Sequence, residues 1–275
     1  MSGAEDMPST IAAALPPIEA WIDRDDLRSV PTATYWNDVE IERLKVFGNP
    51  ERLSEYLKET SLEATLHDAV RLAQRGGWEC SGTGIDLAAG ACWTTAILSR
   101  LPAVHRIYAV DISAHRLGEL APRICAHFGA VPAKVRRVIG SFYDIRLPDR
   151  SVDFCVMSQG FHHADDPERL VSEMKRVLRP GAPVLLTGET PVYPLALFIA
   201  RLKNIAKFIL PSSLYTAPPV EGLWPSFEAL YPPDAIGGDR AYRIREYERL
   251  FATGFTLRRR RSRRYTTFVA VRNSV

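Results

Sequence analysis

The sequence predicts an α/β fold in which a mainly parallel sheet is covered by helices on both faces. Between residues 84 and 187, short apolar runs typical of buried strands alternate with segments of helical periodicity. This alternation is typical of parallel strands joined by right-handed crossovers. In addition, small residues occupy the turn between the first strand and the first helix. Both observations favour an open sheet of Rossmann type, whose ligand lies at the carboxyl ends of the strands.

The expected elements follow from the spacing of apolar residues. We expect strands at residues 84–88, 106–111, 134–140, 153–158, 183–187, 255–257 and 266–271. We expect helices through Leu98 and Leu101, and at residues 117–128, 167–178, 195–210 and 243–251. The last helix and the last two strands complete the sheet after the strand–helix rhythm breaks at residues 190–240.

The chain divides into four segments. Residues 1–75 form an N-terminal arm and helices: prolines and small residues up to about residue 30 predict a mobile or loosely docked arm, and Asn49-Pro50 begins a helix. Residues 76–190 form the core, residues 191–240 are an insertion, and residues 241–275 supply the last helix and closing strands. The insertion combines an apolar, partly basic helix with prolines and aromatic residues, which suits a shaped wall better than a flexible linker.

The composition is that of an ordinary globular protein. The 275 residues are 46% hydrophobic, and the formal net charge of +3 is too small to imply an anionic partner. No apolar run approaches the ~18 residues of a membrane span, and no basic segment of a secretory signal precedes the first apolar patch. The four cysteines form no C-x-x-C pair and no zinc-site cluster with histidine. We therefore expect a cytoplasmic protein with reduced thiols and no metal.

The turn between the first strand and the first helix carries the clearest chemical signal. Its sequence is Gly84-Ile-Asp-Leu-Ala-Ala-Gly-Ala-Cys92, so backbone N–H groups at the start of the helix can approach a ligand. Asp111 follows about 20 residues after Gly90, at the end of the next strand, where a carboxylate can accept hydrogen bonds from ribose hydroxyls. Both features also occur in nicotinamide and flavin folds, so by themselves they leave the cofactor open.

Four ordered motifs resemble those of the class I S-adenosylmethionine-dependent methyltransferases, in particular the small-molecule, ubiquinone-biosynthesis-like or type 11 group. The positions of the family's D-x-G-x-G-x-G motif are held by Asp86, Ala88, Gly90 and Cys92. The later motifs are Gly140-Ser-Phe-Tyr-Asp-Ile-Arg-Leu-Pro148, Ser151-Val-Asp-Phe-Cys-Val-Met-Ser-Gln-Gly-Phe-His-His163 and Glu173-Met-Lys-Arg-Val-Leu-Arg-Pro-Gly181. The resemblance implies a Rossmann-like seven-stranded sheet, methyl transfer, and S-adenosylmethionine as the cofactor.

The same resemblance assigns roles to individual residues. Asp111 would bind the ribose, Ile112 would pack on the adenine, and Ser158 and Gln159 would lie beside the sulfonium and the acceptor. The remaining cofactor-binding candidates are Tyr35, Asp86, Ala88, Gly90, Ser141 and Phe142. Three residues depart from the family pattern: Ala88 and Cys92 replace glycines, and Ser141 replaces an aspartate that usually meets the adenine amino group.

The catalytic candidates are His163 and Gln159. An imidazole could remove a proton from the acceptor. Alternatively, His162 and His163 only shape the loop after the fourth strand, because alignment alone supplies much of the rate of methyl transfer. Tyr35 and Trp36 either cover the cofactor or anchor the first helices.

Two further segments leave alternatives open. Residues 193–210 either begin an acceptor-binding cap, which this family commonly inserts here, or dock peripherally on a membrane through apolar and basic side chains. The arginine run at 258–264 either binds phosphates or forms a solvated sheet edge that opposes aggregation. We favour the cap and the solvated edge.

The sequence therefore predicts methyl transfer to a small-molecule acceptor that is bulky and partly apolar, with the methylated atom undetermined. The rival hypotheses are an RNA methyltransferase that uses the arginine run and a non-catalytic scaffold. Ser-Gln-Gly-Phe stands after the fourth strand where adenine amino methyltransferases of nucleic acids have an N-P-P-Y-type tetrapeptide, so we expect no nucleic-acid partner. The identity of the acceptor and the oligomeric state stay open.

Overall fold

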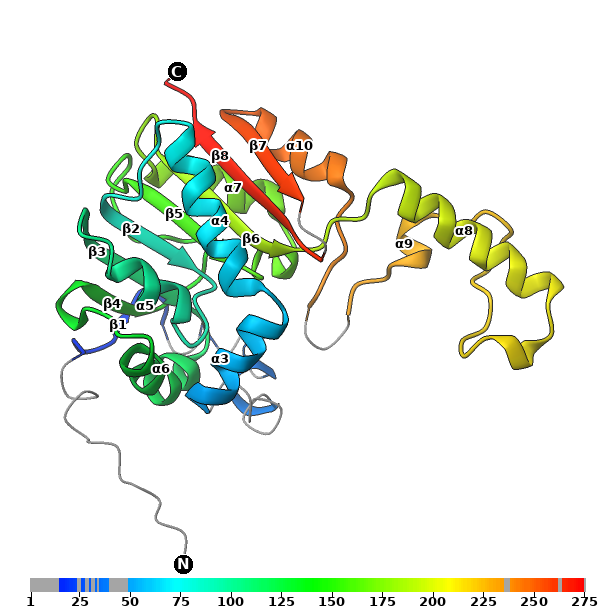
Figure 1. Cartoon of the computed structure of the whole chain (residues 1–275), viewed down its shortest axis with the longest axis horizontal. Coiled ribbons are helices and arrows are strands. Elements are labelled where there is room, and N and C mark those ends of the chain that lie inside the picture. The colour runs from blue at the N-terminus through cyan, green and yellow to red at the C-terminus, as the bar shows by residue number, and fades with distance from the viewer. Residues whose placement is uncertain are drawn as a thin grey trace, which may run out of the picture.

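The fold is built on one eight-stranded sheet with the strand order β1-β4-β3-β2-β5-β6-β8-β7 (Figure 1). The computed structural model describes residues 15–23, 26–27, 30, 33, 35–39, 49–234, 238–261 and 264–274. The strands from β1 to β6 in that order run parallel, β8 is antiparallel to β6, and β7 is antiparallel to β8. The predicted open sheet with a parallel core is confirmed.

All seven predicted strands are present. Their bounds are β2 (Gly82–Leu87), β3 (Val104–Asp111), β4 (Val135–Ile139), β5 (Phe154–Ser158), β6 (Pro183–Glu189), β7 (Phe255–Arg261) and β8 (Thr266–Arg272). The largest difference from the prediction is in β7, which was expected to end at Leu257 and continues through the arginines. Pairing with β8 along the whole length of β7 maintains the strand there, although the arginines have no apolar alternation.

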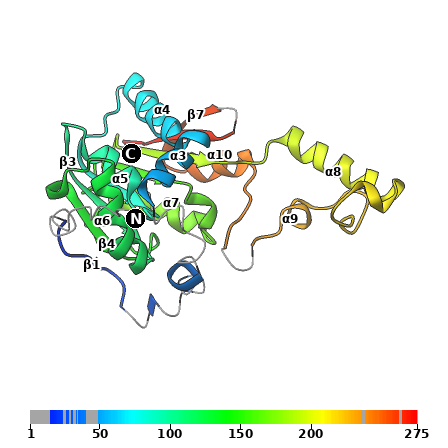
Figure 2. The same ribbon diagram turned by 60° about the horizontal axis from the view of Figure 1, so that its bottom comes forward.

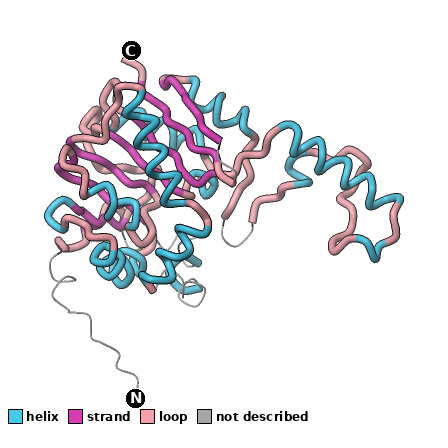
Figure 3. Tube along the Cα trace, viewed as in Figure 1, coloured by secondary structure: helices cyan, strands magenta, loops and turns pink. Residues whose placement is uncertain are grey.

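Helices cover both faces of the sheet (Figures 1 and 3). One face carries α3 (Pro50–Glu59), α4 (Leu62–Arg75), α5 (Trp93–Ser99) and α6 (Ala121–His127), and the other carries α7 (Pro167–Val177) and α10 (Ile244–Ala252). The side chains of β5 alternate between these layers. Phe154 and Val156 belong to the core under α4, and Cys155 and Met157 to the core under α7. Each face thus buries every second residue of the strand.

Two of these helices begin at side-chain caps followed by proline. The Oδ1 atom of Asn49 accepts a hydrogen bond from the backbone N–H of Arg52 at 2.9 Å before α3. Asp166 accepts one from the N–H of Arg169 at 3.0 Å before α7. Proline is tolerated in the first turn because its missing N–H would have no partner there. The helix start predicted at Asn49-Pro50 is confirmed.

The N-terminal segment is better docked than its sequence predicts. Glu19–Ala20 form β1 at the edge of the sheet, parallel to β4. Leu15 and Trp21 are buried, and the ring of Trp21 packs on Tyr108 with the centroids 5.7 Å apart. A two-residue strand has no periodicity that could reveal it in the sequence. Residues 1–14 of the predicted arm lie outside the described residues.

The insertion leaves the body as a separate projection, which we call the α8 arm (residues 193–231). It contains α8 (Pro194–Ile209) and α9 (Phe227–Leu230), and it extends away from the sheet in two views related by 60° (Figures 1 and 2). The chain leaves the body and returns to it at a parallel bridge between Val192 and Arg243. The helix predicted at residues 195–210 is therefore present, but it does not cover the carboxyl edge of the sheet.

Candidate cofactor and acceptor site

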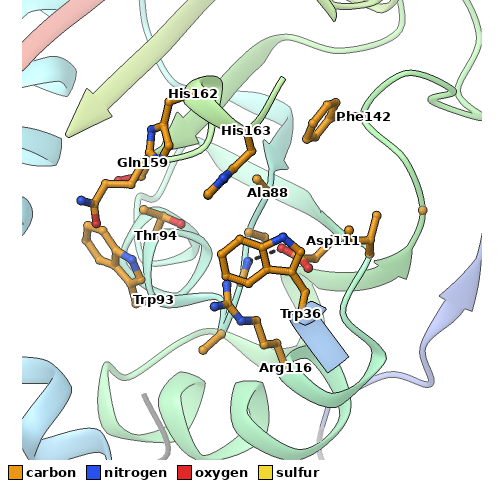
Figure 4. Close-up of a pocket in the computed structure, with 16 residues that line it drawn as sticks. Trp36, Ala88, Trp93, Thr94, Asp111, Arg116, Phe142, Gln159, His162 and His163 are labelled. Carbon is orange, nitrogen blue, oxygen red and sulfur yellow. Dashed lines mark hydrogen bonds between the residues drawn. The ribbon is translucent and has the colours of Figure 1, made fainter. Parts of the chain in front are cut away.

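A cavity of about 260 Å³ lies at the carboxyl ends of the central strands (Figure 4). Its walls come from the loops after β2, β3, β4 and β5 and from the helical turn Tyr35–Val39. None of the described residues of the insertion lines it. The lining residues are Trp36, Ala88, Ala89, Gly90, Ala91, Trp93, Thr94, Asp111, Ile112, Arg116, Gly140, Phe142, Ser158, Gln159, His162 and His163.

The turn after β2 holds three residues in the left-handed conformation. The φ angle is 53° at Ala88, 53° at Gly90 and 65° at Cys92. The motif has glycine at these positions because only glycine adopts this conformation freely. Alanine and cysteine each retain a steric cost of roughly 1–2 kcal/mol. The two departures from the motif therefore leave strain directly beside the cavity, while the backbone still approaches it closely.

Asp111 lies where the sequence places it, at the end of β3 and in the cavity wall. One carboxylate oxygen accepts a hydrogen bond from the N–H of Gly90 and the other from the N–H of Ser113, both at 2.8 Å. Burial raises the pKa of Asp111, and these two donors oppose the shift. A carboxylate oxygen can accept a second hydrogen bond, so both oxygens retain capacity for ribose hydroxyls. Ribose binding by Asp111 stays a prediction.

Asp86 lies beneath the cavity and does not line it. Its Oδ2 atom accepts hydrogen bonds from the hydroxyls of Thr94 at 2.5 Å and Thr95 at 2.6 Å, which join the turn to α5. Its Oδ1 atom has no partner among the described residues. Burial raises the pKa of Asp86 to about 6 even though both threonines lower it. In this position the carboxylate supports the turn, and direct contact with the cofactor stays a prediction.

The other predicted cofactor residues divide into two groups. Ile112, Phe142 and Ser158 line the cavity, and the buried Oγ atom of Ser158 has no hydrogen-bond partner among the described residues. Ser141 does not line the cavity. Its Oγ atom accepts a hydrogen bond from the N–H of Tyr143 at 3.1 Å. Gln159 lines the cavity with φ of 50°, another left-handed non-glycine residue.

Trp36, rather than Tyr35, lines the cavity from the N-terminal side. The ring of Tyr35 packs edge-on against Trp36, with centroids 4.9 Å apart. The guanidinium of Arg116 lies 4.8 Å from the centre of the Trp36 ring, and burial lowers the pKa of Arg116 to about 10. The sequence did not reveal Arg116 as a site residue, because its spacing from Asp111 along the chain matches none of the motifs.

A buried carboxylate holds His162 in place. Glu189, at the end of β6, is fully buried and accepts hydrogen bonds from the hydroxyl of Tyr247 at 3.0 Å and the N–H of Phe161 at 3.1 Å. The Nδ1 atom of His162 lies 3.2 Å from Glu189 Oε2. Burial disfavours the charged forms of both groups. Their mutual attraction and hydrogen bond outweigh this effect, so the pKa of His162 is raised and that of Glu189 is lowered. Glu189 therefore favours the protonated form of His162 and fixes the position of its ring. No sequence motif pointed to Glu189.

His163 is the imidazole best placed to act in the cavity. Its ring packs against Trp36 at 5.0 Å between centroids. Its Nδ1 atom lies 2.9 Å from Oδ1 of Asp239, although the groups are not aligned for a linear hydrogen bond. The His163 imidazole lowers the pKa of Asp239. Donor atoms of His162, His163 and Asp239 lie within 4.8 Å of one another, so among the described residues this cluster could also hold a metal ion.

The comparison of the sequence with protein families agrees with this geometry. A family model described as a methyltransferase domain matches residues 85–186, which run from β2 to β6 and contain the four motifs. The chain carries a class I S-adenosylmethionine-dependent methyltransferase domain. Its cofactor is S-adenosylmethionine, which supplies a methyl group activated by the positive sulfonium.

Solved structures share the fold of this methyltransferase. The YcgJ protein of Bacillus subtilis aligns with a TM-score of 0.54 at 14% identity, over 77% of this chain and 99% of that one. A candidate sarcosine dimethylglycine methyltransferase from Galdieria sulphuraria gives 0.54 at 15%, over 79% and 88%. A candidate methyltransferase of Haloferax volcanii, solved with the Trm112 methyltransferase activator, gives 0.53 at 17%, over 80% and 93%. No curated protein matches this sequence.

The residues of the methyltransferase cavity fit the cofactor. The turn from Ala88 to Ala91 is a backbone cradle, since a Cβ atom on Gly90 would come within 3.2 Å of the Arg116 guanidinium. Ser158 lines the cavity, and its buried Oγ atom has no hydrogen-bond partner among the described residues. Buried polar atoms normally have partners, so this oxygen suits a polar ligand. Asp111, Ile112 and Phe142 would hold the nucleoside part, and Ser158 would lie nearer the methionine part.

Proposed function

We propose that the chain methylates a small, partly apolar acceptor that enters beside His163 and Gln159. In Figure 4, Gln159 lies on the side of the cavity away from Phe142, and His163 lies between them. The observation that carries the proposal is the position of the Asp239 carboxylate, 2.9 Å from the Nδ1 atom of His163, whose imidazole lines the cavity. An imidazole with a carboxylate behind it is suited to remove a proton from an acceptor hydroxyl or amine.

Each residue of this site has a distinct role in the proposal. His163 accepts the proton of the acceptor, and the Asp239 carboxylate compensates the positive charge that forms. His162, held by Glu189, fixes the loop that carries His163. The amide of Gln159 orients the acceptor by hydrogen bonding. The returning limb of the insertion thus supports the histidine loop from outside the cavity, through Asp239 and through the N–H of Arg240, which donates to the carbonyl of His162 at 2.8 Å.

The residues that line the cavity favour an acceptor with an apolar part. Trp36 and Trp93 line the cavity, and aromatic rings bury apolar groups well. The volume of about 260 Å³ is near the lower end of ligand sites, which span about 300–1,000 Å³. Because the cofactor takes up much of this space, the reacting group of the acceptor enters and the remainder stays outside. This supports a small molecule with one exposed end.

The test combines cofactor binding with methyl transfer. Calorimetry with S-adenosylhomocysteine should show one site per chain, and labelled S-adenosylmethionine should methylate members of a panel of substituted phenols and amines. His163→Ala should lower kcat about 10²–10⁴-fold and leave affinity for S-adenosylhomocysteine within about twofold, because His163 lies on the acceptor side. His105→Ala, on an exposed histidine of β3, is the matched control.

The outcomes separate the rival functions. Labelling of RNA but of no panel molecule, with steep loss at high salt, would establish the RNA methyltransferase instead. Absence of cofactor binding would establish the scaffold. Equal kcat values in His163→Ala and wild type would show that His163 does not act as the base. EDTA is included in one series, because loss of activity restored by a divalent ion would assign His162, His163 and Asp239 to a metal.

A further inference from the structure

The exposed apolar surface of the described residues is concentrated in the α8 arm. The large hydrophobic side chains that are exposed all lie between residues 195 and 224. Leu195 is 68% exposed and Ile209 is 77% exposed. The others are Phe198, Ile199, Leu202, Phe208, Leu210, Leu214, Leu223 and Trp224. Exposed apolar side chains concentrated in one segment mark a candidate site of interaction with another molecule or with a membrane.

Helix α8 is packed with its polar side inward. Its one buried residue is Asn204, whose Nδ2 group donates to the carbonyls of Val220 at 3.2 Å and Gly222 at 3.0 Å. The Oδ1 atom of Asn204 accepts from the N–H of Val220 at 2.7 Å. The opposite side presents Leu195, Leu202 and their apolar neighbours at helical spacing. The returning loop is therefore fixed to the polar side, and most of the apolar side stays exposed.

Trp224 extends this apolar surface beyond the helix. Its ring contacts Phe198 edge-on with centroids 5.9 Å apart, and the guanidinium of Arg201 lies 5.0 Å from the ring centre. Tryptophan and arginine side chains combine an apolar body with a polar tip, and they are favoured at the boundary between lipid and water. Helix and loop thus form one surface with an aromatic and basic border.

The charged residues along α8 are all basic, whereas the rest of the α8 arm carries Glu221 and Glu228. Arg201, Lys203 and Lys207 are the charged residues of α8, and residues 190–220 contain no aspartate or glutamate. At the base of the arm, a cavity of about 460 Å³ brings Pro194 and Leu197 together with Arg243, Arg245, Arg249 and Glu246. Arg243 is paired with Glu246 and Arg249 with Glu168. Basic side chains thus follow the apolar surface along α8, while two of the three arginines at its base are paired with carboxylates.

From these observations we infer that the α8 arm docks on an anionic lipid surface, with α8 lying in the interface. An amphipathic helix with basic flanks binds in this way. No helix among the described residues is long and apolar enough to cross a bilayer, so the arm lies on the surface. A second copy of the chain is a poorer occupant, because a two-fold contact through α8 would bring cations of the same sign together. The inference is independent of the acceptor.

The first test measures sedimentation of the full chain with vesicles. We expect binding to phosphatidylcholine–phosphatidylglycerol vesicles and much weaker binding to phosphatidylcholine alone. Replacement of Leu195, Leu202 and Ile209 by serine should weaken binding to the anionic vesicles at least about tenfold. These side chains are exposed, so the urea midpoint and the affinity for S-adenosylhomocysteine should stay at wild-type values.

The second test separates the contribution of charge. Replacement of Lys203, Lys207 and Arg245 by glutamine should weaken binding to the anionic vesicles about tenfold and reduce its dependence on salt. The matched control replaces Lys58, Arg100 and Arg123, which are exposed on the body of the protein, by glutamine. This control should bind as the wild type does.

Two results would overturn the inference. The first is absence of sedimentation with either type of vesicle. The second is a concentration-dependent dimer in lipid-free solution that the triple serine variant abolishes, since the surface would then belong to a second copy. Loss of methyl transfer with normal vesicle binding would affect only the proposed function.

Discussion

The buried Glu189 allows a specific prediction about stability and pH. Glu189→Gln conserves shape but removes the negative charge that holds the protonated His162, leaving an amide opposite the Tyr247 hydroxyl and the Phe161 N–H. Removing one member of a buried ion pair costs about 3–5 kcal/mol. The His162 side chain is 25% exposed, so screening reduces this cost. We expect a loss of about 2–3 kcal/mol in the free energy of unfolding, since a charge-assisted hydrogen bond contributes roughly this much.

The direction of the pKa shifts fixes the pH window of the effect. The pKa of His162 is raised above its ordinary 6.5, so its contribution is fully present below pH 6.5 and is lost as the pH rises through the folded-state value. The pKa of Glu189 is lowered below 4.5, so its contribution is present above pH 4.5 and is lost as the pH falls through the folded-state value. The loss caused by Glu189→Gln should therefore be greatest between pH 4.5 and 6.5.

Urea unfolding across this pH range measures the effect. At alkaline pH the loss should shrink without vanishing, because Tyr247 and Phe161 still donate hydrogen bonds to Glu189. Glu168→Gln is the matched control: this carboxylate is exposed and paired with Arg249, and its removal should cost less than about 1 kcal/mol. A loss in Glu189→Gln that is independent of pH, or no larger than in the control, would refute the ion-pair reasoning.

Two further predictions concern the cofactor and the arginine strand. Asp111→Ala should weaken S-adenosylhomocysteine binding by about 1–3 kcal/mol and also lower stability, because the N–H groups of Gly90 and Ser113 lose their acceptors; unchanged affinity in calorimetry would remove the ribose assignment. Replacing Arg259 and Arg260 by glutamine should leave methyl transfer unchanged, because these side chains pair with acidic residues of the body. Tight, salt-sensitive RNA binding that this variant loses would contradict the structural role.

The sequence was most informative where local chemistry and sheet topology agree. Asp111 could be placed because the spacing from the turn to the next strand end is set by one strand–helix–strand unit. Glu189 could not be placed by that logic. It meets His162 only because β6 is the neighbour of β5 in the sheet, and the two residues are 27 positions apart in sequence. Contacts of this kind depend on which strands pair and leave no periodic signal.

The N-terminal side shows a different limit. The sequence indicated that the aromatic pair Tyr35–Trp36 could cover the cofactor, and Tyr35 was the residue assigned to cofactor binding. In the structure Trp36 lines the cavity instead, in contact with Arg116 and His163, both distant in sequence. Similarly, the apolar periodicity of α8 predicted the helix correctly. Periodicity shows that one face is apolar, and it does not say whether that face contacts the protein's own core.

Because of the bridge between Val192 and Arg243, the α8 arm is a structural unit that is attached to the body at one place. The N–H of Val192 donates to the carbonyl of Tyr242 at 2.8 Å, and the N–H of Ile244 donates to the carbonyl of Val192 at 3.1 Å. The chain therefore leaves and re-enters the body at adjacent points, where inserted sequence is tolerated. Related enzymes could gain, lose or exchange such an arm without rebuilding the sheet. The place where the enzyme works could then change in evolution independently of its methyl chemistry.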